Sequence, residues 1–158
     1  MATRVSDVLA ADAIVIRPQW DSFTATVRGL VERLVAAGRL PAALADVAVH
    51  RVIEREAVAS TAMVDIGVSI PHARLEGVKE IVAALAVAPQ AVYQVADGAP
   101  ISTVALVLSS PNLTGGHLTF LAALSILLQS AHLRQQLRQA TSADEVVRAI
   151  RQHEQNRG

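Results

Sequence analysis

The sequence of 158 residues contains no cysteine. This absence excludes disulfide bonds, metal sites built on thiolates and a cysteine nucleophile. A chain without cysteine also fits a reducing compartment, so we expect a cytoplasmic protein.

Aromatic residues and net charge are scarce as well. Phe, Trp and Tyr make up 3% of the chain, which leaves little material for stacking on nucleic-acid bases. Fourteen basic and fourteen acidic side chains cancel, so no overall field draws the protein to nucleic acid or to an anionic membrane. We therefore expect no nucleic-acid partner, and any electrostatic recognition to be local.

Long hydrophobic runs are also missing. The longest, from Ile81 to Pro89, is less than half of the roughly 20 residues that span a bilayer. Arg4, Asp7 and Asp12 interrupt any leader-like segment near the N-terminus. These features predict a soluble protein that is not exported.

Hydrophobic residues, mainly Ala, Val and Leu, supply 52% of the chain. This content predicts one domain over residues 1–158, with its core at roughly residues 5–153. Nearly continuous apolar runs indicate strands buried on both faces, and apolar residues at helical spacing indicate the helices. We expect strands at 13–16, 68–70, 81–87 and 101–108. We expect helices over 23–38, from Pro41, from near His117, over 133–140 and from Ser142. At the start of the last helix, Ser142 and Glu145 are expected to form a capping box. The predicted fold class is α/β, a single-domain sandwich with a central mixed β-sheet flanked by helices on both faces.

The segment Ile70-Pro71-His72-Ala73-Arg74 is the most informative motif. Proline fixes its own φ and has no N–H to donate, so the strand is expected to end here and to present the His72 imidazole at the sheet edge. An unperturbed imidazole changes charge near neutral pH. A surface histidine in an ordinary turn is the alternative interpretation of this motif.

His117 follows Gly115 and Gly116 at an expected helix N-terminus, where backbone N–H groups attract an anion and glycine allows close approach. Arg55 offers a planar fork of donors that matches phosphate oxygens. Two histidines, an arginine and hydroxyl groups can together hold a phosphoryl group on an imidazole nitrogen. The sequence predicts His72, His117 and Arg55 as catalytic residues, and Ser60, Thr61, Arg74 and Gly116 as phosphate-binding residues; His50, His132 and His153 are expected to be solvated.

These residues carry a resemblance to a known family. Arg55-Glu56, Ser60-Thr61, Gly67 to Arg74, Asp97-Gly98 and His117-Leu118 with Leu121 follow one another in the order typical of one domain type. The chain resembles the fructose/mannitol-type enzyme IIA domain of the bacterial phosphotransferase system (PTS), a family that includes the nitrogen-regulatory IIA proteins. The resemblance covers roughly the whole chain and implies a mixed sheet flanked by helices.

The resemblance also implies roles and partners. His72 falls on the phosphorylated histidine of the family, His117 on its second active-site histidine, Arg55 on its motif arginine and Thr61 on the threonine before the histidine strand. It implies a phosphotransferase subunit that accepts a phosphoryl group from an HPr-like carrier and passes it to a IIB component in sugar uptake, with neither cofactor nor metal. Membrane contact would be only indirect, through a IIBC transporter. A regulatory IIA protein, whose phosphorylation switches protein contacts, is the alternative.

The loop from Thr61 to Pro71 departs from the family pattern, because it is about one residue longer and poorer in glycine. Asp65 in this loop would repel a phosphoryl group if it faced inward, and would bond His72 or Arg55 if it turned aside. The sequence lacks the spacing of a metal-dependent hydrolase, a Gly-x-Ser-x-Gly elbow and a phosphate loop, which disfavours those three classes. We expect a shallow, open pocket with an apolar rim that includes Ile70 and Leu118.

Overall fold

A mixed β-sheet forms the centre of the computed structural model, which describes residues 4–157. Its strands are ordered β1-β4-β7-β2, and β3 also pairs with β7. The β4 and β7 strands are antiparallel, whereas β1 runs parallel to β4, and β2 and β3 run parallel to β7. The strands are β1 (Ile14–Ile16), β2 (Val68–Ser69), β3 (His72–Arg74), β4 (Val82–Val87) and β7 (Thr103–Ser109). A small hairpin of β5 (Tyr93–Gln94) and β6 (Pro100–Ile101) stands apart from the sheet.

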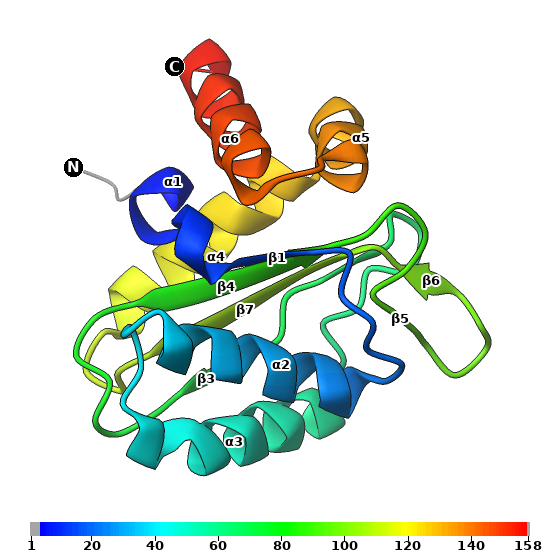
Figure 1. Ribbon diagram of the computed structural model, residues 1–158. Helices are drawn as coiled ribbons and strands as arrows, with labels where there is room; N and C mark the ends of the chain where they lie inside the picture. The colour runs from blue at the N-terminus through cyan, green and yellow to red at the C-terminus, as the bar shows by residue number, and fades with distance from the viewer. Residues whose placement is uncertain (1–3, 158) are drawn as a thin grey trace.

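Helices cover both faces of the sheet (Figure 1). One face carries α2 (Phe23–Ala36) and α3 (Ala45–Val58), and the other carries α1 (Val5–Val8), α4 (Thr114–Leu128), α5 (Ala131–Gln139) and α6 (Ala143–Arg157). Short 3-10 turns at Ala11–Ala13 and Ala42–Leu44 precede β1 and α3.

The central strand β7 explains why two separate cores form. All seven of its residues are buried, and alternate side chains of a strand point to opposite faces. Leu106 and Leu108 pack with Val27, Leu30 and other residues under α2 and α3. Ala105 and Val107 pack with Phe120, Leu124 and other residues under α4 to α6. The predicted fold class, a mixed sheet between two helical layers, is confirmed.

Two predicted element boundaries next to the histidines are wrong. The strand predicted at 68–70 does not end the pairing at Pro71, because β3 resumes it at His72 and pairs with the same neighbour, β7. The Pro71 carbonyl accepts from Val107 N at 3.0 Å, so the proline keeps its acceptor in the ladder although it has no donor. The helix predicted to start near His117 starts at Thr114 instead, which places Gly115 and Gly116 inside its first turn.

The capping residues of the last helix are partly as predicted. Ser142 Oγ accepts from Glu145 N at 3.2 Å, as expected of a cap. The Glu145 carboxylate does not return to Ser142, however, but accepts from Thr141 N at 3.2 Å and from Thr141 Oγ1 at 2.7 Å.

Across residues 4–157, no single helix is long and apolar enough to cross a membrane. One pair of helices meets that criterion only when taken together, residues 115–128 with 131–139, and the two are bent by 83° at the break between them.

Candidate functional site

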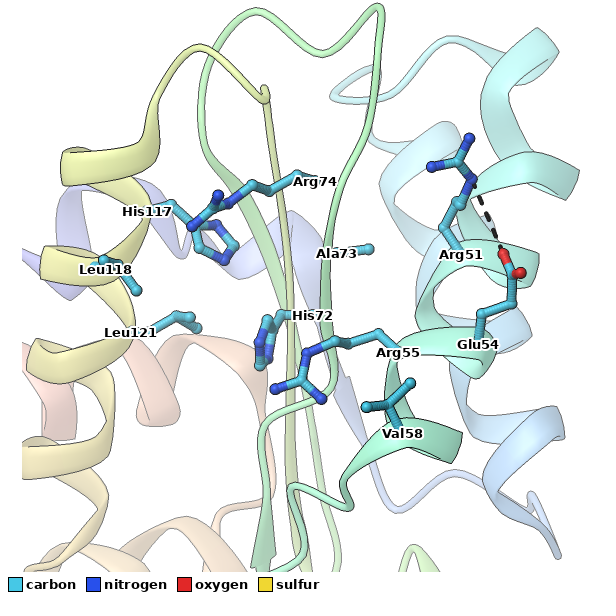
Figure 2. Close-up of a pocket in the computed structure, with 10 residues that line it drawn as sticks. All are labelled: Arg51, Glu54, Arg55, Val58, His72, Ala73, Arg74, His117, Leu118 and Leu121. Atoms are coloured by element: carbon cyan, nitrogen blue, oxygen red, sulfur yellow. Dashed lines mark ion pairs between the residues drawn. The ribbon is translucent and has the colours of Figure 1, made fainter.

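An open pocket of about 570 Å³ lies where α3, β3 and the start of α4 meet (Figure 2). The start of α4 is far from the other two elements in the sequence, and β7 brings it near them because β3 pairs with β7 and α4 follows β7. Helix α3 packs against β3. Two histidines, three arginines, one glutamate and four apolar residues line the pocket: His72, His117, Arg51, Arg55, Arg74, Glu54, Val58, Ala73, Leu118 and Leu121. The structure therefore brings together four of the seven predicted site residues, namely His72, His117, Arg55 and Arg74.

His72 has a defined tautomer. Its Nδ1 lies 2.8 Å from the Ile70 carbonyl oxygen, and a carbonyl oxygen can only accept, so Nδ1–H is the donor. In the neutral ring, the lone pair then resides on Nε2. His72 is half-buried at the start of β3, in the pocket wall. Nε2 therefore carries the available lone pair of a ring that is held on a paired strand.

His117 is a buried neighbour of His72. Its side chain is 3% exposed, and its ring centroid lies 5.5 Å from that of His72, with the ring planes tilted by 57°. Its backbone N–H donates to Leu113 O at 2.7 Å within the first turn of α4, so this N–H is not free for an anion as the sequence predicted. His117 Nδ1 makes a hydrogen bond with the Ser109 hydroxyl.

Burial lowers the pKa of His117 to about 4, because the charged imidazolium would lose its hydration. Positive charge at His72 and Arg74 acts in the same direction. At neutral pH, His117 is therefore a neutral ring with one N–H.

Arginine side chains place positive charge beside each histidine. In Figure 2, the Arg55 guanidinium lies next to the His72 ring, and the Arg74 guanidinium lies next to His117. Arg55 Nη1 donates to Ala59 O at 3.0 Å, a contact that fixes its direction at the end of α3. Arg51 points away from the histidines, toward Glu54, at an Nε to Oε1 distance of 4.0 Å. Two guanidinium groups are thus placed to neutralise an anion bound between the rings.

The predicted hydroxyl residues are placed differently from what we expected. Glu56 accepts from Ser60 Oγ at 3.0 Å, from Thr61 N at 2.7 Å and from Thr61 Oγ1 at 2.9 Å. Neither Ser60 nor Thr61 lines the pocket, so the two residues close the loop after α3. Gly116 is exposed and also lies outside the lining.

The loop and rim predictions have mixed outcomes. Asp65 is exposed and is not among the lining residues, so its carboxylate does not face the pocket. Leu118 contributes to the rim and is 57% exposed, as predicted. Ile70 is 7% exposed and belongs to the core under α4, so its predicted place on the rim is wrong.

Sequence reasoning missed several lining residues. Three of them lie on the same face of α3 as Arg55, at steps of three and four residues along the helix: Arg51, Glu54 and Val58. That spacing could have identified them once Arg55 was selected. Ser109 was missed too, because its hydrogen bond to His117 depends on how α4 turns back after β7.

The other histidines lie outside the pocket. His50 and His132 are exposed, as predicted. His153 is half-buried, and its Nε2 is buried with no hydrogen-bond partner, so the expectation of a solvated side chain is wrong there. Within the part of the chain that the structure describes, no group of three or more His, Asp and Glu side chains is arranged to hold a metal ion.

The fold and the pocket define a class of protein, α/β domains in which a mixed sheet presents two adjacent imidazoles between arginines. Comparison with known families identifies the chain within this class. The family described as "Phosphoenolpyruvate-dependent sugar phosphotransferase system, EIIA 2" matches residues 7–153, and the chain belongs to this family.

Two relatives are longer proteins, and each is named as an EIIABC component of a PTS system. The chain is 32% identical to the PTS system fructose-specific EIIABC component of Bacillus subtilis (strain 168) over 104 residues, which cover 65% of this chain and 16% of that protein. It is 28% identical to the PTS system 2-O-alpha-mannosyl-D-glycerate-specific EIIABC component of Escherichia coli (strain K12) over 142 residues, 88% of this chain and 21% of that protein. The chain thus spans about a fifth or less of the length of these relatives.

Solved structures agree with the fold. The nitrogen regulatory protein IIA-Ntr from Neisseria meningitidis superimposes with a TM-score of 0.78 at 26% identity, covering 92% of this chain and 98% of that one. The IIA mannitol structure from Escherichia coli gives a TM-score of 0.72 at 19% identity, covering 89% and 97%.

Proposed function

We propose that this protein is a histidine phosphocarrier of the phosphotransferase system, with His72 as the residue that carries the phosphoryl group. The observation that carries the proposal is the His72 ring itself. Its Nδ1–H is held by the Ile70 carbonyl, and Nε2 is left as the nucleophile beside Arg55 and His117. We also propose that residues 1–158 form one domain of the EIIA 2 type.

The transfer step exchanges one phosphorus–nitrogen bond for another. The bond from phosphorus to the donor imidazole breaks as the bond to His72 Nε2 forms, and the donor ring keeps the electron pair of the broken bond. Each ring retains the proton on its other nitrogen, which for His72 is the proton donated to Ile70 O. Arg55 and Arg74 neutralise the oxygens of the group in transit, so the chemistry depends on positioning and electrostatics.

The proposed partners are an HPr-like carrier as donor and a IIB component as acceptor. Two features support partner docking, namely the open pocket and the exposed apolar side chains of Leu118 and Val58 at its rim. We propose a cytoplasmic location, with membrane contact only through a IIBC transporter, and a place in sugar uptake. The fructose-specific and mannosylglycerate-specific names of the relatives belong to those longer proteins and leave the sugar open.

A regulatory role is the second candidate. The match to the neisserial nitrogen regulatory protein, over 92% of this chain, favours it. In this role, the same phosphorylation of His72 would switch a protein contact by adding negative charge. The two roles share the phosphorylation step and differ in the acceptor.

The test is phosphorylation of the purified protein by phosphoenolpyruvate, enzyme I and HPr, followed by intact mass measurement. We expect the wild type to gain one acid-labile phosphate and His72→Ala to gain none. His132→Ala is the matched control, because His132 is exposed and lies outside the pocket, and it should be phosphorylated like the wild type. Full phosphorylation of His72→Ala, or none of the wild type, would refute the assignment.

Transport and regulation are separated by a second measurement. Phosphorylated protein is mixed with a purified IIB domain of the fructose type, and the phosphate on each protein is followed by mass. Transfer to IIB supports the transport role. Retention on His72, with an active IIB control, supports the regulatory role.

A further inference from the structure

The buried histidine of the pocket, His117, is hydrogen-bonded to Ser109, a residue that does not itself line the pocket. Ser109 is the last residue of β7 and is fully buried, and His117 is 3% exposed. The Ser109 hydroxyl and His117 Nδ1 are hydrogen-bonded to each other. In the parallel register of β3 and β7, Ser109 is the partner of Arg74. The sheet therefore fixes the backbone positions of these two neighbours of His117, Ser109 and Arg74.

A neutral imidazole carries a single N–H, and its position decides what His117 offers to the pocket. If the proton is on Nδ1, Nε2 presents a lone pair, which repels phosphoryl oxygens. If the proton is on Nε2, the ring is a donor to those oxygens. A hydroxyl can either donate or accept, so the hydrogen bond to Ser109 by itself is compatible with either tautomer of His117.

The surroundings favour the second arrangement. Nδ1 is occupied by Ser109, so Nε2 is the nitrogen left for a group bound in the pocket. Arg55 and Arg74 already place two positive charges in the pocket. A neutral N–H donor on His117 adds a hydrogen bond there without adding a third positive charge. An Nε2 lone pair close to a phosphoryl group on His72 would be unfavourable, since the ring centroids are 5.5 Å apart.

We propose that Ser109 is a positioning residue: its hydroxyl donates to His117 Nδ1, holds the proton of His117 on Nε2 and so makes that nitrogen a neutral donor to the phosphoryl group on His72. The functional part of this proposal rests on the proposed phosphorylation of His72. Ser109 does not line the pocket, so in this proposal it acts only through His117.

The first test is the tautomer of His117 in the unphosphorylated wild type at pH 7, measured by long-range 15N–1H correlation of imidazole-labelled protein. We expect the chemical shift of Nδ1 to be that of an unprotonated imidazole nitrogen, and the chemical shift of Nε2 to be that of a protonated one. The Nδ1–H tautomer in the wild type would overturn the proposal, and this spectrum requires no variant to fold.

Ser109→Ala tests whether the hydroxyl is responsible. Without it, the His117 resonances should shift toward a mixture of tautomers, because nothing donates to Nδ1. The matched control is Ser110→Ala, since the neighbouring Ser110 is 8% exposed and its Oγ accepts from Asn112 N at 3.1 Å rather than contacting His117. A spectrum of Ser109→Ala that matches the wild type would overturn the proposal.

A kinetic arm connects the tautomer to the reaction. We expect Ser109→Ala still to be phosphorylated on His72, and the rate of phosphoryl transfer to fall by about tenfold, the effect of one lost hydrogen bond. A rate equal to that of Ser110→Ala would count against the proposal. Failure of the wild type to accept any phosphate would instead refute the proposed function, and the tautomer result would still stand.

Discussion

At the scale of single residues, the two histidines differ in how they are held. His72 donates to a backbone carbonyl on a paired strand and is half-buried beside Arg55. His117 has a hydroxyl partner, and its burial, with His72 and Arg74 nearby, lowers its pKa and leaves it neutral at physiological pH. Under the proposed function, this difference suits His72 to form the bond to phosphorus and His117 to support that bond without competing for it.

The low pKa of His117 predicts a loss of stability in acid. The folded-state pKa is about 4 and the unfolded value about 6.5, so between these values the unfolded chain binds a proton that the folded protein does not. The free energy of unfolding should therefore fall as pH drops from 6.5 to 4, by at most about 3 kcal/mol from this group. Urea unfolding at several pH values measures the slope.

The variant that checks this assignment is His117→Gln, which should unfold with a shallower pH slope than the wild type. His132→Gln provides the comparison, because His132 is exposed. Identical slopes for the wild type and His117→Gln would show that His117 is not the group responsible.

His72, His117 and Arg55 could be selected from the sequence because each stands in a recognisable local context: after a proline, after two glycines or near a helix end. The positions of Ser60 and Thr61 were misjudged because Glu56, one helical turn away, takes up their hydroxyl groups. A sequence records which donors are near one another along the chain. It does not show that the chain after α3 brings these two hydroxyl groups to the Glu56 carboxylate and not to the pocket.

At the scale of elements, the turn that leads into β2 sets the position of the histidine strand. Gly67 has a φ of +68°, and its carbonyl accepts from Ser102 N at 2.9 Å and from Thr103 N at 3.2 Å. A Cβ at this position would lie 3.3 Å from Pro100 O. The turn needs glycine both for its backbone conformation and for the close approach of the neighbouring chain.

Gly67→Ala should therefore destabilise the fold by more than a substitution at another left-handed glycine. Adoption of this φ by alanine costs about 1–3 kcal/mol, and the contact with Pro100 adds to that cost. Gly98→Ala is the matched control, since Gly98 has a φ of +87° and a Cβ there would meet nothing within 4 Å. Urea unfolding of the two variants measures the difference, and equal losses would contradict the role assigned to the close approach.

The strand after Pro71 was not predicted, for a related reason. Proline removes a donor, which in a single sequence indicates the end of a strand. Here the ladder requires only the Pro71 carbonyl, which accepts from Val107 N, so pairing with β7 continues to Arg74. The direction in which a neighbouring strand presents its donors decides the outcome, and that information is not local.

At the scale of the whole molecule, the layered fold was predictable because the strands at 82–87 and 103–109 are almost purely apolar. Such strands must be covered on both faces, and the helices on each side supply the cover. Some helices nevertheless keep large apolar residues in contact with solvent, and α4 is one of them. The α4 helix contains no Asp, Glu, Lys or Arg, and its Leu118 and Ile126 are 57% and 51% exposed.

Substitutions at Leu118 and Ile126 can distinguish a specific docking surface from a general effect of surface hydrophobicity. Leu118 lines the pocket, and Ile126 does not. We expect Leu118→Asp to slow phosphoryl transfer from HPr by tenfold or more, because the new charge would repel the phosphoryl group and remove apolar contact area. Ile126→Asp, with similar exposure on the same helix, should transfer at the wild-type rate. Stopped-flow or quenched-flow transfer assays measure both, and equal rates would place the docking surface elsewhere.

The pocket takes its residues from α3, β3 and the start of α4, and β7 pairs with β3 and leads into α4. His72 is therefore synthesised well before the strand that supports it and before His117. On a ribosome, the emerging chain would expose the imidazole while its strand partner β7 and its buried neighbour His117 were both still missing. Under the proposed function, a nascent chain could not be charged with phosphate, and only protein that had completed synthesis and folding would enter the phosphorelay.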